Sequence, residues 1–141
     1  MNKIEERIME KFNIGAIKGI LEKENNILFA YLYGSFSKSV ERKDSDIDIG
    51  IFVKDLSDME KYYPEKLALK IERMIGGEID IRILNDRDII FLHQVLKYGK
   101  LLFSKNEKKR IKFETDVYKK YIDFVYYMEE YDRIRRRRIL A

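Results

Sequence analysis

The spacing of hydrophobic and polar positions changes several times along the chain, and each change predicts a new helix or strand. Side chains on a strand point to opposite faces in turn, so strands carry alternating or continuous apolar runs. Helices repeat their apolar positions every three to four residues. We expect strands at residues 27–33, 46–53, 78–84 and 100–103. We expect helices at residues 2–24, 58–75, 86–99 and 106–138.

The segment ILFAYLY at 27–33 is almost entirely apolar, which is typical of a central strand covered on both faces. The helix at 58–75 carries Pro64 in its first half and ends at Gly76-Gly77. This succession of elements predicts an α+β fold of mixed α/β character. We expect a mixed sheet of about four strands, flanked by helices and followed by a long C-terminal helix.

The strand at 46–53 is unusual because Asp46 and Asp48 stand two residues apart among isoleucines. On a strand the two aspartates share one face, and the isoleucines share the other, which we expect to be core. Two like charges on one face repel unless positive charge lies between them. The strand at 78–84 alternates in the same way and carries Asp80 on its polar face. If the two strands pair, the three carboxylates converge on one face.

The residues directly after the first strand are suited to binding a phosphate. Gly34-Ser35 offers backbone N–H groups and a hydroxyl at the start of a short helix. Magnesium takes hard oxygen ligands and bridges protein carboxylates to substrate phosphates. Carboxylates that face a phosphate cradle therefore predict a site for two Mg²⁺ ions and a nucleotide, whose charges explain why the paired aspartates are tolerated.

Net charge is distributed unevenly along the chain. Residues 1–104 carry 17 basic and 18 acidic residues, a balance of −1, whereas residues 105–141 carry 12 and 7, a balance of +5. The chain has no cysteine, which excludes disulfides and thiolate metal sites. It has no run of about 18 or more apolar residues and no signal-peptide pattern, so we expect no membrane segment and a cytoplasmic location.

The C-terminal helix is longer than a small domain is wide. About 33 residues at 1.5 Å each would span roughly 50 Å. Its apolar residues follow a three-four spacing, namely Phe113, Val117, Tyr121, Phe124, Met128 and Tyr131. Part of this stripe would extend past its own domain, so we expect a partner chain to cover it. The arginines at 135–138 are open to three interpretations: a solvated helix end, a protein-docking segment, or an RNA contact, of which docking is favoured.

These motifs carry a family resemblance. Gly34-Ser35, ten residues and then Asp46-Ile47-Asp48 resembles the Gly-Ser-x10-Asp-x-Asp signature of the DNA polymerase β nucleotidyltransferase superfamily. More narrowly, residues 25–105 and the basic helix resemble the minimal nucleotidyltransferases that act as antitoxins to HEPN-domain ribonucleases. Lys38-Ser39 stands where many relatives have Arg-Gly, and lysine meets a phosphate as a point charge without the bidentate fork of arginine.

The resemblance implies a Mg²⁺-dependent protein adenylyltransferase that moves AMP from ATP to a tyrosine of a HEPN toxin and so inactivates it. It implies that Asp46 and Asp48 hold two Mg²⁺ ions. Asp80 would bind the ion on the nucleophile side and help to deprotonate the acceptor hydroxyl. Gly34 and Ser35 would hold the β- and γ-phosphates, with Lys38 as a further nucleotide contact.

Two other functions stay open, a nucleotidyltransferase that modifies small molecules such as antibiotics and an antitoxin that neutralises by contact alone. We expect one domain at 1–141, with a catalytic core at 1–104 and a partner-binding helix at 105–141. The lack of a second, acceptor-holding domain favours an acceptor delivered by another protein, and the carboxylates favour catalysis.

Individual residues also have plainer interpretations. Asp46 and Asp48 could be solvated residues on an open sheet face, and Asp80 could simply pair with Arg82. His93, the single histidine, is expected to be structural or at the surface.

Overall fold

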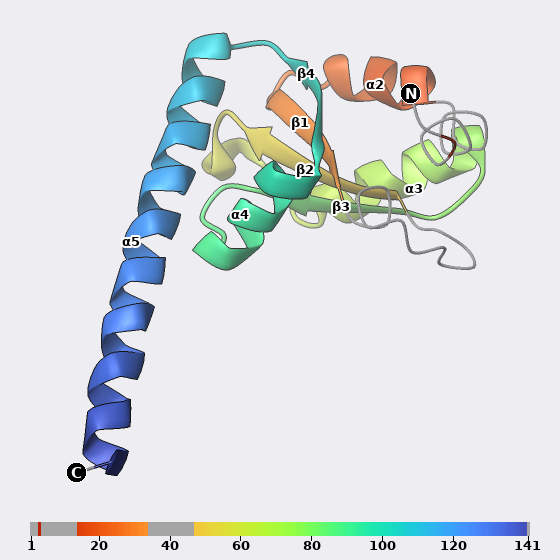
Figure 1. The fold of residues 1–141 in the computed structure, drawn as a ribbon. Helices are drawn as coiled ribbons and strands as arrows, with labels where there is room; N and C mark the ends of the chain where they lie inside the picture. The colour runs from red at the N-terminus through yellow and green to blue at the C-terminus, as the bar shows by residue number, and fades with distance from the viewer. Residues whose placement is uncertain (1–2, 4–13, 34–46, 141) are drawn as a thin grey trace.

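The computed structural model describes residue 3, residues 14–33 and residues 47–140. Helices and strands alternate along the chain, and the last helix is by far the longest (Figure 1). The order is α2 (Ile14–Glu22), β1 (Ile27–Tyr33), β2 (Ile47–Val53), the 3₁₀ helix η2 (Leu56–Asp58), α3 (Tyr63–Ile75), β3 (Ile79–Ile83), α4 (Ile89–Tyr98), β4 (Lys100–Ser104) and α5 (Glu107–Leu140).

The strands form one mixed sheet in the order β3-β2-β1-β4. β1 runs antiparallel to both of its neighbours, β2 and β4, whereas β2 and β3 are parallel. The first six residues of β1 are buried, because helices cover both faces of the sheet at this strand. The predicted mixed sheet and the central, doubly covered first strand are therefore confirmed.

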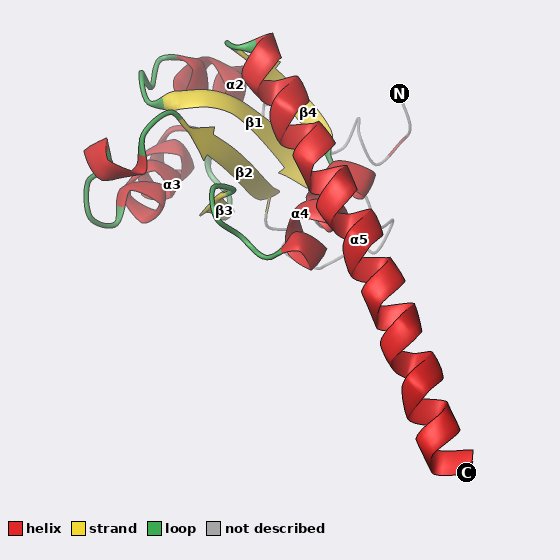
Figure 2. Cartoon of the chain, turned by 90° about the vertical axis from the view of Figure 1, so that its left-hand side faces the viewer, coloured by secondary structure: helices red, strands yellow, loops and turns green. Residues whose placement is uncertain are grey.

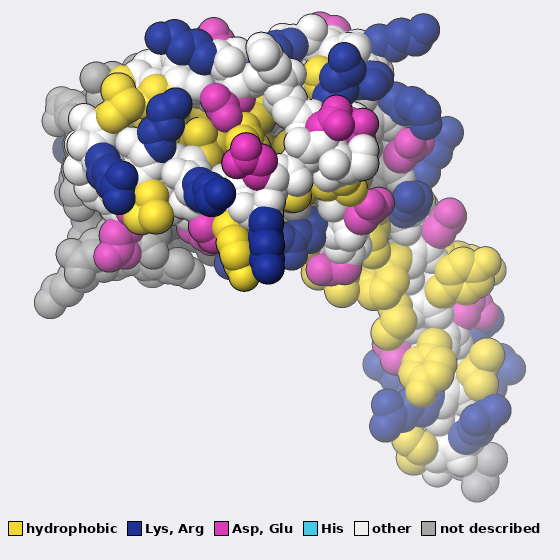
Figure 3. Space-filling view, turned by 180° about the vertical axis from the view of Figure 1, so that it is seen from behind, with side chains coloured by type: hydrophobic (Ala, Val, Ile, Leu, Met, Phe, Trp, Pro, Cys, Tyr) yellow, Lys and Arg dark blue, Asp and Glu magenta, His cyan; other side chains and the backbone are white. Residues whose placement is uncertain are grey.

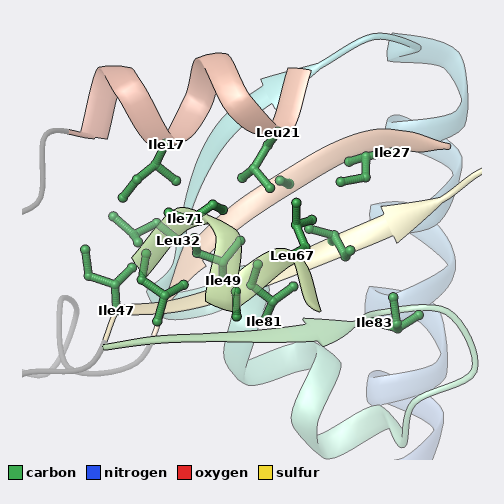
Figure 4. Packing of buried hydrophobic residues seen from close by; sticks show 14 of the residues in the cluster. Ile17, Leu21, Ile27, Leu32, Ile47, Ile49, Leu67, Ile71, Ile81 and Ile83 are labelled. Atoms are coloured by element: carbon green, nitrogen blue, oxygen red, sulfur yellow. The ribbon is translucent and has the colours of Figure 1, made fainter. Parts of the chain in front are cut away.

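One face of the sheet is covered by α2 and α3. Ile17 and Leu21 of α2 and Ile71 of α3 are fully buried against the isoleucines of β2 (Figure 4). The neighbouring strand adds its own isoleucines to this cluster, because β2 and β3 are paired residue for residue. The isoleucine face of the Asp-containing strand is thus core, as the alternation predicted.

The opposite face is covered by α4 and by the first part of α5 (Figure 2). Leu92, Val95 and Val117 pack there with the aromatic residues of β1. A Cβ atom at Gly50 would lie 2.7 Å from Leu84 Cδ2, so the absence of a side chain lets Leu84 lie directly on β2. This face is apolar at β1 and carries charged residues on β3, where Asp80 and Arg82 lie.

Only the N-terminal part of α5 is anchored to the domain. Asn106 caps the helix by accepting a hydrogen bond from the Lys109 N–H at 3.0 Å. The Tyr31 hydroxyl donates to Glu114 Oε1 at 2.6 Å and ties the helix to the sheet. Val117 is the one buried residue among those described in α5, and the C-terminal half projects away from the domain (Figure 1).

Several helix boundaries differ from the predicted ones. The expected helix at 58–75 is wrong in its first part: η2 ends at Asp58 and α3 begins only at Tyr63. Pro64 lies in the first turn of α3, because proline lacks an N–H and its ring clashes with a preceding helical turn. The helix expected at 86–99 begins at Ile89, because the Asp88 side chain caps it through the Phe91 N–H at 2.9 Å.

The other elements agree with the prediction where they are described. The remaining strands match within one residue, and α5 continues two residues beyond the expected end. Of the helix expected at 2–24, Ile14–Glu22 is helical, and residues 4–13 lie outside the described part. None of the helices in the described ranges is both long enough and apolar enough to span a membrane.

Candidate active site

Asp48 and Asp80 come together across two neighbouring strands. The parallel pairing of β2 with β3 places their Cα atoms in register, so both carboxylates lie on the same face of the sheet. Both residues are partly exposed, whereas the isoleucines on either side of each are buried. The pairing of the two strands and the convergence of these two carboxylates, both predicted from the alternation, are confirmed.

The remaining predicted site residues, Gly34, Ser35, Lys38 and Asp46, lie outside the described residues. The described chain nevertheless leads to them from two directions. Tyr33, the last residue of β1, is in register with Asp48, and Gly34-Ser35 follows it in the sequence. Asp46 directly precedes Ile47, the first residue of β2. In the sequence, Gly34-Ser35 thus follows the end of β1 and Asp46 precedes the start of β2, the two strand ends beside Asp48.

Arg82 lies beside the two carboxylates and pairs with one of them. Its Nε atom donates to Asp80 Oδ2 at 3.0 Å, and the side chains are 50% and 44% exposed. The plainer interpretation of Asp80, pairing with Arg82, is thus realised in this structure. An ion pair this exposed contributes at most about 1 kcal/mol to stability. A half-exposed carboxylate of this kind remains accessible to a metal ion.

The charges around Arg82 reinforce its positive state. Proximity to Tyr33, followed by Asp80 and Asp48, raises the pKa of the Arg82 guanidinium, against an opposing effect of desolvation. The guanidinium therefore supplies positive charge beside carboxylates that would otherwise repel each other. From the sequence, we expected only the metal ions and the nucleotide to offset the repulsion between the aspartates.

Tyr33 closes the site on the side of β1. Burial is the main cause that raises the pKa of its hydroxyl well above the ordinary value, and Asp48 and Asp80 raise it further. The hydroxyl is therefore neutral near pH 7. It is buried and has no hydrogen-bond partner among the described residues. The Tyr33 ring meets Phe91 of α4 edge-on, with ring centroids 5.6 Å apart.

Sequence reasoning gave Arg82 only a possible pairing with Asp80, and it assigned no role to Tyr33, Arg87 or Phe91. The sequence indicates that Arg82 lies near Asp80, because Arg82 stands two residues after Asp80 and shares its face of the strand. The sequence gives no such indication for Phe91 and Arg87, because their positions depend on the turn at Asp86 and on how α4 packs across the sheet. Asp86 has φ of 57°, a left-handed conformation that redirects the chain after β3.

The donor atoms fit a hard divalent cation, since Asp48 and Asp80 offer carboxylate oxygens on one face. Among the described residues, no group of three or more histidine, cysteine or acidic side chains lies together as a metal site. Asp46, the third carboxylate of the predicted set, lies outside those residues. The described part of the chain thus contains two of the three predicted ligands, and the complete set remains a prediction.

The projecting half of α5 forms a second candidate site of a different kind. Its apolar side chains gather along the helix and are interspersed with basic ones (Figure 3). Met128 and Tyr131 of the predicted stripe are 43% and 58% exposed, and the neighbouring Tyr127 is 68% exposed, although such residues usually contribute to cores and interfaces. The arginines at 135–138 are also exposed. This part of the predicted stripe is therefore uncovered by its own domain, as expected.

Comparison with known proteins agrees with this geometry. A curated relative, the protein adenylyltransferase MntA of Shewanella oneidensis, is 28% identical over 87 residues. Those residues are 62% of this chain and 61% of the relative, so the chain matches less than two thirds of that protein's length.

Two solved structures share the fold. One is a toxin–antitoxin with AMP-PNP, with a TM-score of 0.67 at 23% identity over 79% of this chain and 89% of the other. The second is the tri-AMPylated Shewanella oneidensis HEPN toxin in complex with its MNT antitoxin, and the matching chain has a TM-score of 0.65 at 22% identity. That match covers 82% of this chain and 89% of the other.

The family model described as Polymerase beta, Nucleotidyltransferase matches residues 15–108, which is more than half of the chain. The matched segment contains every strand of the sheet and both described carboxylates. The chain therefore belongs to the polymerase beta nucleotidyltransferase family.

Proposed function

We propose that this protein is an antitoxin that acts as a Mg²⁺-dependent adenylyltransferase and transfers AMP from ATP to a tyrosine of a HEPN-domain toxin. The observation that carries the proposal is the register of Asp48 with Asp80 on one face, beside the end of β1. Membership of the nucleotidyltransferase family supports the reaction type. The similarity to a protein named as an adenylyltransferase supports the choice of a protein acceptor.

Each site residue has a distinct role in this reaction. Asp46 and Asp48 would hold two Mg²⁺ ions, and Asp80 would contribute to holding one of them. Gly34-Ser35 binds the β- and γ-phosphates, and Lys38 adds positive charge to them. When bound, the metal ions stabilise the charge that develops on the phosphate oxygens, which is worth several kcal/mol.

The transfer is a single in-line displacement. The acceptor hydroxyl oxygen forms a bond to the α-phosphorus of ATP while the bond from that phosphorus to the bridging α–β oxygen breaks. Pyrophosphate leaves, and the hydroxyl proton passes toward the Asp80 carboxylate. Tyr33 takes no part as a base, because its raised pKa keeps it protonated near pH 7.

The exposed part of α5 is the proposed docking surface for the toxin. Its uncovered tyrosines and basic residues have the composition of an interface, in which aromatic anchors are surrounded by charge. This division of the chain, with a core at 1–104 and a partner-binding helix at 105–141, is part of the proposal. Docking of protein is favoured over direct binding of nucleic acid.

Mass spectrometry of the co-expressed partner tests the proposal. A neighbouring reading frame that encodes a small all-helical protein with an Arg-x4–6-His motif would supply the partner to clone. After incubation with Mg²⁺ and each nucleoside triphosphate in turn, we expect the partner to gain the mass of one or more AMP units with ATP. The Asp48→Asn variant is the control, and it should leave the partner unmodified.

Neutralisation by contact alone is the second candidate function, and the exposed stripe on α5 favours it. Growth rescue separates the two functions. If Asp48→Asn still neutralises the co-expressed toxin without modifying it, binding alone is sufficient. If AMP is transferred only to a small molecule such as an aminoglycoside, the proposal of a protein acceptor is wrong.

A further inference from the structure

A cationic surface lies beside the two carboxylates, and the mechanism above does not use it. Arg82 of β3 and Arg87 of the following loop both lie against the ring of Phe91. Their guanidinium carbons are 5.8 and 5.9 Å from the ring centroid, a separation within the range of cation–π contacts. Phe91 is only partly buried. Two guanidinium groups and an aromatic ring thus form one continuous patch.

Among the described residues, Arg82 and Arg87 form their hydrogen bonds through Nε. Arg82 donates from Nε to Asp80, and Arg87 donates from Nε to the Ile83 carbonyl at 2.9 Å. Neither uses its terminal nitrogens in a hydrogen bond to another residue of the described ranges. Terminal nitrogens arranged in this way bind carboxylates or phosphates in a bidentate manner. The patch is therefore able to receive an anionic group.

The sheet order places Arg82 on the β3 side of Asp48, and Phe91 reaches from α4 to Tyr33 at the end of β1. β1, which leads into Gly34-Ser35, lies on one side of β2, and β3 with Arg82 lies on the other. Asp48 stands between them. Arg82 is paired with Asp80, the carboxylate assigned to the acceptor side, so an acceptor that reaches Asp80 would meet the patch.

A groove lies next to the patch, and Arg87 is one of the residues that line it. The groove has a volume of about 590 Å³ and lies between the loop after β3 and the first part of α5. Apolar residues line it, including Phe52, Leu84 and Phe113, and four lysines stand around it, namely Lys54, Lys109, Lys112 and Lys120. Lys112 is paired with Asp116 at 3.0 Å, and the other three form no ion pair with a described residue.

The composition of the groove favours an acidic polypeptide over a nucleic acid. The Phe52 ring is stacked on Phe29 with centroids 4.6 Å apart and is contacted by Phe113 at 5.1 Å, so the ring faces are occupied by protein. A base would need an open aromatic face for stacking. Asp86 and Asp116 also interrupt the positive rim and would repel a continuous row of phosphates. A peptide with separate carboxylates on either side of an apolar side chain fits the lysines and the apolar lining of the groove better than a nucleic acid does.

We propose that the acceptor residue is carried by an acidic polypeptide segment. This segment runs from Asp80 across Arg82, Phe91 and Arg87 and places an apolar side chain in the lysine-rimmed groove. The proposal rests on the proposed function, because it assumes that the acceptor is a protein. It adds the chemistry of the acceptor segment and the residues that select it.

Peptide binding tests the inference without metal or nucleotide. The probes are short fluorescein-labelled peptides with one tyrosine and one leucine, surrounded by glutamates, glutamines or lysines. We expect the full chain to bind the glutamate peptide about tenfold more tightly than the lysine peptide, with an affinity that falls as salt rises. Equal anisotropy curves for the three peptides, or no binding of the glutamate peptide, would overturn the proposal.

Charge-reversed variants locate the binding surface. Arg87→Glu and the double variant Lys109→Glu with Lys120→Glu should each weaken binding of the glutamate peptide about tenfold. Lys70→Glu is the matched control, because Lys70 is exposed on α3, which covers the other face of the sheet. If Lys70→Glu weakens binding equally, the effect is one of net charge and the groove is not the site. Thermal melts verify that each variant is folded.

Kinetics with the toxin partner separate failure of this inference from failure of the proposed function. We expect the same charge-reversed variants to raise the KM for the partner about tenfold and to change the KM for ATP by less than about twofold. If the KM for ATP rises instead, the arginines bind nucleotide and the inference is wrong. If the parent protein transfers no AMP to the partner, the proposed function fails whatever the variants do.

Discussion

His93 lies flat against Tyr121, with ring centroids 3.5 Å apart and ring planes 2° apart. The edge of a second ring, that of Tyr118, meets the same imidazole at 6.1 Å. Because His93 is on α4 and both tyrosines are on α5, this stack joins the two helices that cover the carboxylate face of the sheet. The single histidine is therefore a packing residue, as its sequence context predicted, and it helps to set the direction in which α5 leaves the domain.

Protonation of His93 should weaken this contact. Burial, followed by the charge of Lys97, lowers the pKa of His93 in the folded state below its ordinary value near 6.5. The unfolded chain then binds the proton more readily, so stability is present above pH ~6.5 and is lost as pH falls toward the lowered folded-state pKa. We expect urea midpoints to fall between pH 7 and 5.5 by more in the parent than in His93→Gln. Parallel pH profiles for the two proteins would contradict this.

The hydrogen bond from Tyr31 to Glu114 anchors α5 to the sheet, and its loss should be measurable. Tyr31→Phe removes the hydroxyl that donates at 2.6 Å and leaves the partly buried Glu114 carboxylate with Arg110 as its remaining partner among the described residues. A net loss of about 1 kcal/mol in unfolding free energy is expected, measured by urea denaturation. Tyr127→Phe is the control, because its side chain is largely exposed, and it should change stability by less than about 0.5 kcal/mol.

Asp46→Asn and Asp48→Asn should each abolish nucleotidyl transfer while the fold survives. Loss of a metal ligand removes charge stabilisation worth several kcal/mol, which corresponds to a rate lower by about a thousandfold or more. Removal of one of two close negative charges relieves repulsion in the metal-free protein, so the melting temperature should stay the same or rise. AMP transfer by either variant at the parent's rate would show that the two-metal assignment is wrong.

Asp80→Asn should separate transfer from nucleotide binding. Asp80 is assigned to the ion on the acceptor side, whereas the phosphates depend on Gly34-Ser35 and on the other ion. We expect severe loss of transfer with an ATP affinity within about threefold of the parent, measured by calorimetry with Mg²⁺. Loss of the half-exposed pair with Arg82 should cost at most about 1 kcal/mol of stability. Disappearance of ATP binding together with activity would contradict this division of roles.

Partner docking should respond differently to aromatic and to charged changes on α5. Tyr121 and Phe124 are not suitable probes, because both are partly buried and Tyr121 supports the contact with α4. Replacing the exposed Tyr127 or Tyr131 with Ala should instead speed dissociation of the toxin, since aromatic anchors carry much of an interface's affinity. Charge reversal of the arginines at 135–138 should slow association in a salt-dependent way, measured by surface plasmon resonance.

Deletion of residues 132–141 tests whether the arginines at 135–138 belong to the docking surface. Unchanged association of the partner after the deletion would remove the arginine run from the docking surface. A salt-dependent shift of labelled RNA by the intact protein, lost in the deletion variant, would assign the run to RNA instead.

The sequence by itself determined the order and type of the elements and the two faces of each strand. Alternation in β2 and β3 was sufficient to separate Asp48 and Asp80 from the isoleucines, because the side-chain period of a strand is local geometry. The Gly-Ser and Asp-x-Asp spacing was likewise sufficient to indicate the family. The same local reasoning placed helix starts too early at α3 and α4, because the deciding feature was one residue, Pro64 in the first case and the Asp88 cap in the second.

Only the tertiary structure decided what surrounds the carboxylates. The pairing of β2 with β3 was a hypothesis until the register placed Asp48 opposite Asp80. The approach of Phe91 and Arg87 to Arg82 depends on a left-handed residue at Asp86 and on the packing of α4 against the sheet. Such contacts join residues whose side chains have no common period in the sequence. They depend on how helices pack on a twisted sheet, a property of the whole fold that no single segment encodes.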